Sequence, residues 1–112
     1  MRVQLENDTI RVRVDEDELA VLLQGGALSG STAFGQVFTM RYVVAPIAAS
    51  VCGLSGDPSA WRVSVPHADL QALKLSLPSK DGLFFEMPGH DSVVTTLRFD
   101  VDVKDSLRRR RG

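Results

Sequence analysis

Six arginines fall on the polar positions of alternating stretches in this 112-residue chain. The apolar residues of these stretches recur at every second position, which is typical of β-strands with one buried face and one solvated face. An arginine fork binds a carboxylate or phosphate group through two parallel hydrogen bonds, which lysine cannot do. The candidate ligand-binding residues for an anion are therefore Arg2, Arg11, Arg13, Arg41, Arg62 and Arg98.

The same arginines also have a structural interpretation. Glu6, Asp100 and Asp102 lie on similar faces of these stretches, so cross-strand ion pairs would explain the pattern equally well. The formal net charge of the chain is -1, which argues against a strongly basic binding surface. We favour ion pairing within the protein and keep a small anionic ligand as the alternative.

Thiol catalysis and metal binding have few candidate residues here, because the chain has one cysteine and two histidines. Cys52 would need a base such as His67 or His90 to act as a nucleophile. Its neighbours Val51 and Gly53 instead indicate a small core residue in or beside a strand. The histidines and the nearby acidic residues show no recognised metal-site spacing. We therefore expect no catalytic residue, no metal site and no cofactor.

Two further segments could contact phosphate groups. Residues 25–31 are rich in glycine and serine, but they follow an expected helix, whereas phosphate loops run from a strand into a helix. We interpret residues 25–35 as a flexible connector. The four arginines at 108–111 could touch nucleic acid, but they lack an aromatic partner and fit a disordered basic tail better. Nucleic acid is thus a second, weaker alternative as a partner.

The elements that would position these residues follow from hydrophobic periodicity. Strands are predicted at residues 3–5, 10–14, 38–44, 61–65 and 97–103. Such clean alternation favours antiparallel sheets, since parallel sheets are usually buried on both faces. Helices are predicted at residues 15–23 and 66–73. Asp15 and Glu18 have the spacing of a capping box in the first helix, and Pro66 suits the first position of the second.

A weak internal repeat relates the two halves of the chain. A shift of 51 residues places Arg11, Val12 and Val14 over Arg62, Val63 and Val65, and Leu19 and Leu22 over Leu70 and Leu73. In both copies a strand runs directly into a short helix. The repeat predicts two strand–helix–strand units around a pseudo-twofold axis that share one core.

Length and composition suit one globular domain, with 44% hydrophobic and 24% charged residues. The chain has no signal-peptide pattern, no apolar run long enough to span a membrane, and one lone cysteine, so we expect a cytoplasmic protein. We predict a single α+β domain over residues 1–107, followed by a disordered basic tail at 108–112. It would contain two short helices and about six to eight strands in a mostly antiparallel curved sheet or partly open barrel.

The first 25 residues resemble a small bacterial family of conserved proteins of unknown function. Its members open with an alternating strand, a polar turn, the pattern Ser/Thr-Ile/Leu-Arg-x-Arg and an acid-capped helix. Here these are residues 2–5, Asn7-Asp8, residues 9–13 and residues 15–19. Residues 33–35 and 97–105 look similar as well. The resemblance implies a bacterial protein and brings no activity with it.

The sequence is therefore most consistent with a small non-enzymatic binding or assembly module. We expect it to self-associate, with a homodimer as the simplest form, because the edges of β-rich folds need cover. The alternative is an anion-binding domain, or an enzyme acting on phosphorylated or carboxylate ligands, that uses the arginine-lined sheet face. No membrane partner is expected.

Overall fold

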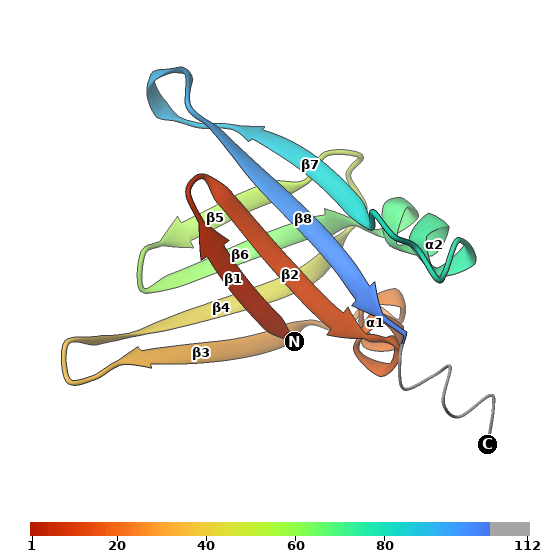
Figure 1. Cartoon of the computed structure of the whole chain (residues 1–112), viewed down its shortest axis with the longest axis horizontal. Coiled ribbons are helices and arrows are strands. Elements are labelled where there is room, and N and C mark those ends of the chain that lie inside the picture. The colour runs from red at the N-terminus through yellow and green to blue at the C-terminus, as the bar shows by residue number, and fades with distance from the viewer. Residues whose placement is uncertain (104–112) are drawn as a thin grey trace.

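Eight strands and two α-helices are formed by residues 1–103, the part of the chain that the computed structural model describes (Figure 1). The strands are β1 (Arg2–Glu6), β2 (Thr9–Asp15), β3 (Leu28–Phe34), β4 (Phe38–Ile47), β5 (Gly53–Asp57), β6 (Ala60–Pro66), β7 (Leu83–Pro88) and β8 (Val94–Asp102). The helices are α1 (Glu16–Leu23) and α2 (His67–Leu75), and one 3-10 turn covers His90–Ser92. The predicted α+β class is confirmed. The predicted basic tail lies outside the described residues.

The strands form two sheets of four, ordered β1-β2-β8-β7 and β3-β4-β6-β5. In each sheet the outer pairs are antiparallel, and the central pair, β2 with β8 or β4 with β6, is parallel. Four of the six strand pairings are antiparallel, as predicted for a mostly antiparallel fold, but both sheets are mixed. Alternating apolar and polar residues indicate that one face of a strand is exposed to solvent. They do not indicate whether neighbouring strands are parallel or antiparallel. Here each parallel pair is flanked by antiparallel hairpins and keeps one face in solvent.

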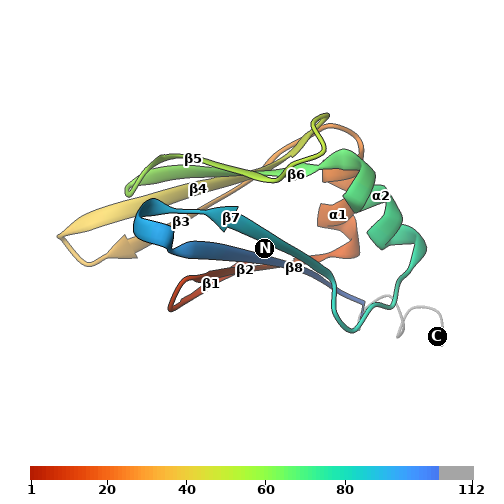
Figure 2. The ribbon, with the colours of Figure 1, turned by 90° about the horizontal axis from the view of Figure 1, so that it is seen from above.

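The two sheets lie face to face, and the two helices close one end of the space between them (Figure 2). At the other end the strands run out past the core, and the β3–β4 hairpin extends farther than the hairpins of the first sheet. None of the helices in residues 1–103 is long and apolar enough to cross a membrane.

The internal repeat accounts for this arrangement. Each half of the chain supplies a hairpin, a helix and a second hairpin, and the two hairpins of one half enter different sheets. The shift of 51 carries β1 onto β5, β2 onto β6 and the first residue of α1 onto that of α2. Past α2 the shift becomes 55, because Leu28 and Leu83 begin β3 and β7 (83 - 28 = 55). The second half therefore has four additional residues, of which one lengthens α2 and three lie between α2 and β7.

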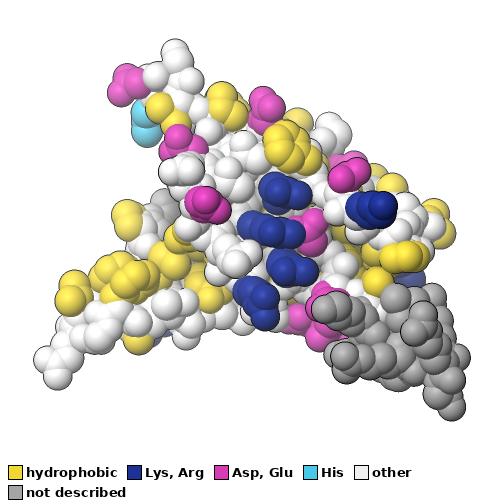
Figure 3. Space-filling view, viewed as in Figure 1, with side chains coloured by type: hydrophobic (Ala, Val, Ile, Leu, Met, Phe, Trp, Pro, Cys, Tyr) yellow, Lys and Arg dark blue, Asp and Glu magenta, His cyan; other side chains and the backbone are white. Residues whose placement is uncertain are grey.

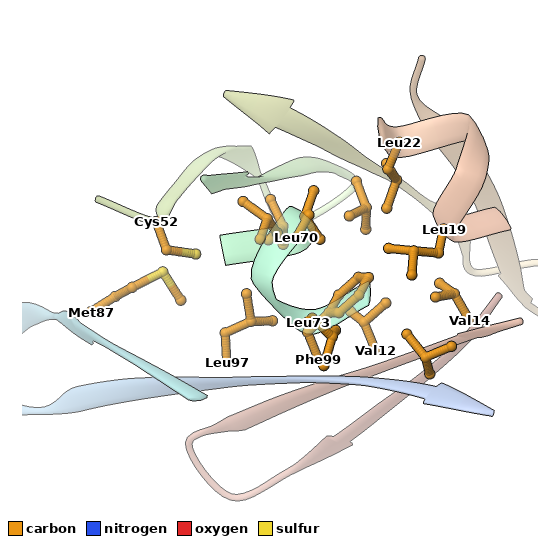
Figure 4. Close-up of a cluster of buried hydrophobic side chains, with 14 residues drawn as sticks. Val12, Val14, Leu19, Leu22, Cys52, Leu70, Leu73, Met87, Leu97 and Phe99 are labelled. Atoms are coloured by element: carbon orange, nitrogen blue, oxygen red, sulfur yellow. The ribbon is translucent and has the colours of Figure 1, made fainter. Parts of the chain in front are cut away.

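The core lies between the sheets and is completed by both helices (Figure 4). Residues that the repeat makes equivalent are buried alike: Val12 and Val63, Val14 and Val65, Leu19 and Leu70, and Leu22 and Leu73 are each at most 3% exposed. Each fully buried leucine contributes about 1.5–3 kcal/mol to the free energy of unfolding. Two units that could not each bury an apolar face thus share one interior.

The helix ends largely follow the sequence signals. The Asp15 side chain accepts a hydrogen bond from the Glu18 backbone N–H at 2.7 Å, and Glu18 accepts one from the Asp15 N–H at 3.1 Å, so the capping box is confirmed. Pro66 precedes the first turn of α2 as its N-cap instead of occupying the first helical position. The Nε2 atom of His67 lies 3.0 Å from the Leu23 carbonyl oxygen and ties the start of α2 to the end of α1.

Strand β3 occupies most of the segment that the sequence indicated as a flexible connector, so that prediction is wrong. Cross-strand packing compensates for its small residues. The ring of Tyr42 lies over Gly30, where an added Cβ would come within 2.4 Å of it, and the Tyr42 hydroxyl lies 3.2 Å from the Thr32 hydroxyl. Local propensity could not reveal this strand, because its stability comes from the neighbouring β4.

Candidate functional site

Four of the six predicted arginines share the outer face of the first sheet. Arg11 and Arg13 on β2 alternate with buried Val12 and Val14, so their side chains point away from the core. Arg2 on β1 and Arg98 on β8 join them in register. We call Arg2, Arg11, Arg13 and Arg98 the arginine face. In Figure 3, Lys and Arg side chains gather over the middle of this sheet, with acidic side chains around them.

Like charges lie directly opposite each other on this face. Arg11 is the register partner of Arg98 across the parallel pair, and Arg2 is the partner of Arg13 across the β1–β2 hairpin. Like-charged side chains in such positions repel and destabilise a sheet. The arrangement therefore brings four positive charges together, although Arg13 also faces Asp100 across the β2–β8 pair.

One buried carboxylate partly offsets this charge. The Nε atom of Arg11 donates to Asp100 Oδ2 at 2.8 Å, and Asp100 is only 8% exposed. The ion-pair interpretation is correct for this one pair. Among the described residues, no salt bridge within 4 Å is formed by Arg2, Arg13 or Arg98. One carboxylate thus contacts one of the four guanidinium groups.

The remaining two predicted arginines lie elsewhere. Arg41 on β4 and Arg62 on β6 alternate with the buried Met40 and Val63, which places them on the outer face of the second sheet. That face is on the opposite side of the molecule from the arginine face, with the core between them. The six arginines therefore do not converge on one ligand.

A broad hollow of about 710 Å³ lies over the first sheet. Its lining includes Arg11, Arg98, Gln4, Thr9, Thr96 and Phe84. Phe84 is the β7 register partner of Arg98 and is 60% exposed. Sequence reasoning missed it, although Leu83-Phe84-Phe85 places one aromatic residue on each face of any strand formed there. An exposed aromatic ring thus lies beside an arginine in a hollow of ligand size.

A second surface is apolar and belongs to the far end of the second sheet. Phe34 and Phe38 stack with ring centroids 4.5 Å apart, yet each is more than 40% exposed. Val37 in the connecting turn is 84% exposed. We call Phe34, Val37 and Phe38 the hairpin tip. Hydrophobic side chains cluster over this part of the molecule in Figure 3.

The apolar character continues from the hairpin tip toward the core. Tyr42 and Trp61 stack with centroids 5.2 Å apart on the inward-facing side of the second sheet. A hollow of about 520 Å³ between the sheets is lined by Trp61, Met40 and Leu54, together with Leu5 from the first sheet. The end of the sheet sandwich away from the helices is therefore open and apolar.

The candidate nucleophile Cys52 is buried, although it lines one hollow of about 640 Å³ together with the candidate base His90. Burial, followed by the nearby negative charge of Asp69, raises the pKa of the Cys52 thiol to about 11. At neutral pH this side chain is a protonated thiol and a poor nucleophile. The ring of His67 contacts the Leu23 carbonyl, and His90 lies in the turn before β8. In residues 1–103, no three His, Cys, Asp or Glu side chains are grouped in a way that could hold a metal ion.

The chain matches no family model, no curated protein and no solved structure. The resemblance of the first 25 residues to a bacterial family of unknown function therefore stays a prediction. Two surfaces of the described chain are candidates for a functional role, the arginine face and the apolar end of the second sheet.

Proposed function

We propose that this protein is a small non-enzymatic assembly module that forms a homodimer through strand β3. The observation that carries the proposal is that β3 pairs with β4 on one side only and has an open edge on the other. Its seven residues, Leu28–Phe34, include no charged residue and no proline. An open edge of this kind is a template for a further strand.

The other edge strands carry features that discourage such pairing. β1 contains Arg2 and Glu6, β5 ends at Asp57, and β7 contains Glu86 and Pro88. Charges and prolines on an edge block the approach of a second strand. Of the four sheet edges in the described chain, β3 alone has neither. A second copy of this chain is the occupant we favour, because two neutral edges meet without like-charge repulsion.

Antiparallel pairing of β3 with its copy about Ser31 would also cover apolar surface. Residues at equal distances on either side of Ser31 would face each other, so Leu28 of one chain would lie opposite Phe34 of the other. Apolar cross-strand pairs of this type contribute about 0.2–1 kcal/mol each. The same surface patch would serve both subunits, as a closed twofold interface requires.

The oligomeric state in solution tests the proposal, by size-exclusion chromatography with light scattering. We expect the wild-type protein to be a dimer and Ser31→Lys to be a monomer, because two lysines would meet at the twofold axis. Ser55→Lys is the matched control: Ser55 is also exposed on an edge strand of this sheet, and its register partner is likewise an arginine. A monomeric wild-type protein, or a Ser31→Lys variant that remains as dimeric as Ser55→Lys, would contradict the proposal.

A further inference from the structure

We propose that the arginine face is a nucleotide site in which a base stacks on Phe84 and the phosphates bind Arg98 and Arg11. This site is on the opposite sheet from β3 and does not depend on the proposed dimer. Two opposed arginine pairs, Arg11 with Arg98 and Arg2 with Arg13, share one contacting carboxylate among the described residues.

The carboxylates on this face lie in the rows on either side of Arg98 and Arg11. Glu86 and Glu6 share a row with Thr96 and Thr9, and Asp100 is opposite Arg13 and forms the ion pair with Arg11. Asp15 lies beyond Arg13 on β2, but its carboxylate accepts the capping hydrogen bond at the start of α1. Glu6 lines the hollow, two residues beyond Gln4 on the edge strand. The row of Arg98 and Arg11 itself contains no carboxylate, so an anion there can contact the Arg98 guanidinium and the Arg11 nitrogens that Asp100 does not occupy. A phosphate group matches that geometry, since each fork can bind two of its oxygens.

The exposed ring of Phe84 indicates which class of anionic ligand the site would bind. Phe84, Arg98, Arg11 and Gln4 form one row across β7, β8, β2 and β1. Adjacent strands are about 4.8 Å apart, so Phe84 and Arg11 are separated by about 10 Å along this row. A nucleoside diphosphate can span that length with its base on the ring and its phosphates on the arginines. Exposed aromatic side chains on sheet faces are suited to stacking with bases in this way.

The surroundings of the row suit the rest of such a ligand. The hollow of about 710 Å³ is within the usual size range of small-molecule sites. The hydroxyls of Thr9 and Thr96, register partners on β2 and β8, lie in its lining next to the arginines. They supply donors and acceptors for a sugar or for phosphate oxygens. A stacked base would account for the 60% exposure of Phe84, an apolar side chain whose neighbours on this face include Arg98 and Glu86.

Isothermal titration calorimetry with adenosine diphosphate, adenosine and pyrophosphate tests the site. We expect the diphosphate to bind at least about tenfold more tightly than either fragment, because only it uses both the ring and the arginines. Arg98→Gln should weaken the diphosphate and pyrophosphate alike. Phe84→Ala should weaken the diphosphate by about tenfold and leave pyrophosphate unchanged. Arg62→Gln, on the other sheet, is the matched control and should change nothing.

Each outcome decides part of the proposal. Absence of diphosphate binding, or binding that Arg98→Gln leaves intact, would overturn it. Equal binding of diphosphate and pyrophosphate, with no effect of Phe84→Ala, would leave a phosphate site and reject the base. The last titration uses a short single-stranded oligonucleotide. If it binds more tightly than adenosine diphosphate and still depends on Phe84 and Arg98, the site recognises a nucleotide within a nucleic-acid strand. Failure of the Ser31→Lys test leaves all of these outcomes unaffected.

Discussion

Arg11 and Arg98 lie directly opposite each other on the parallel pair of β2 and β8, although 87 positions separate them in the chain (98 - 11 = 87). Only Arg11 reaches the buried carboxylate of Asp100. The two arginines are therefore alike in charge and register but different in energetic role. That difference can be measured in the absence of any ligand.

Arg98→Gln is expected to raise the free energy of unfolding by about 0.2–1 kcal/mol, because it removes one of two opposed like charges. Arg11→Gln is expected to lower it by about 1–3 kcal/mol, because it leaves Asp100 buried without its charged partner. Urea unfolding measures both changes, and Arg62→Gln serves as the control. The gain for Arg98→Gln should shrink in high salt, where the repulsion is screened. If both variants shift stability in the same direction, the assigned roles are wrong.

Substitution by alanine should destabilise the protein to different extents at two glycines with positive φ. At Gly56 (φ 106°) an added Cβ would lie 2.2 Å from the Ala60 carbonyl oxygen, whereas at Gly35 (φ 54°) it would meet nothing within 4 Å. Gly35→Ala is expected to cost about 1–2 kcal/mol, from the backbone conformation alone. Gly56→Ala should cost more, because backbone of the β5–β6 hairpin must also move. Thermal unfolding of both variants checks the order, and equal losses would mean that the hairpin adjusts freely.

The parts of the fold that the sequence predicts well are those fixed by local chemistry. The capping box of Asp15 and Glu18 and the turn at Asn7 depend on residues a few positions apart, and both are present. The 51-residue repeat is also readable, because Leu19 and Leu70 occupy the same buried place in two copies of one unit. The four additional residues in and after α2 prevent any single shift from aligning the whole repeat.

The parts that could not be predicted depend on pairing between distant strands. The opposition of Arg11 and Arg98 exists only because hairpins from the two halves meet in one sheet, and alternation within either strand cannot show it. The same pairing places Phe84 beside Arg98. Strand β3 was missed because its Gly30 is stabilised by the Tyr42 ring of another strand. The arginines could be named from the sequence, but their grouping into four and two could not.

The start of α1 offers a test of the capping box in isolation. Asp15→Ala is expected to lower the free energy of unfolding by about 1 kcal/mol, since the Glu18 N–H loses its acceptor. Asp15→Asn should cost much less, because asparagine caps helices about as well as aspartate does. Chemical denaturation monitored by circular dichroism compares the two. Equal losses would show that the charge of Asp15, and not its hydrogen bond, matters at this position.

Because of the Cys52 thiol, the stability of the protein and the reactivity of this side chain should both change with pH in the alkaline range. Its pKa in the folded protein is raised from an ordinary value of 9.0 to about 11, first by burial and then by the charge of Asp69. The folded state thus favours the protonated thiol more than the unfolded state does. The resulting stabilisation is fully present below about pH 9 and is lost as the pH rises toward 11. The wild-type protein should therefore lose stability relative to Cys52→Ala across this window.

Alkylation by iodoacetamide reports the same property through kinetics. At pH 8 the native thiol should react far more slowly than the thiol of the protein unfolded in urea, because the thiolate is the reactive form and Cys52 is only 6% exposed. Raising the pH from 8 to 10 should accelerate native labelling in parallel with thiolate formation. Rapid native labelling at pH 8 would instead require a low thiol pKa. It would also restore Cys52 as a candidate nucleophile and count against the proposed non-enzymatic function.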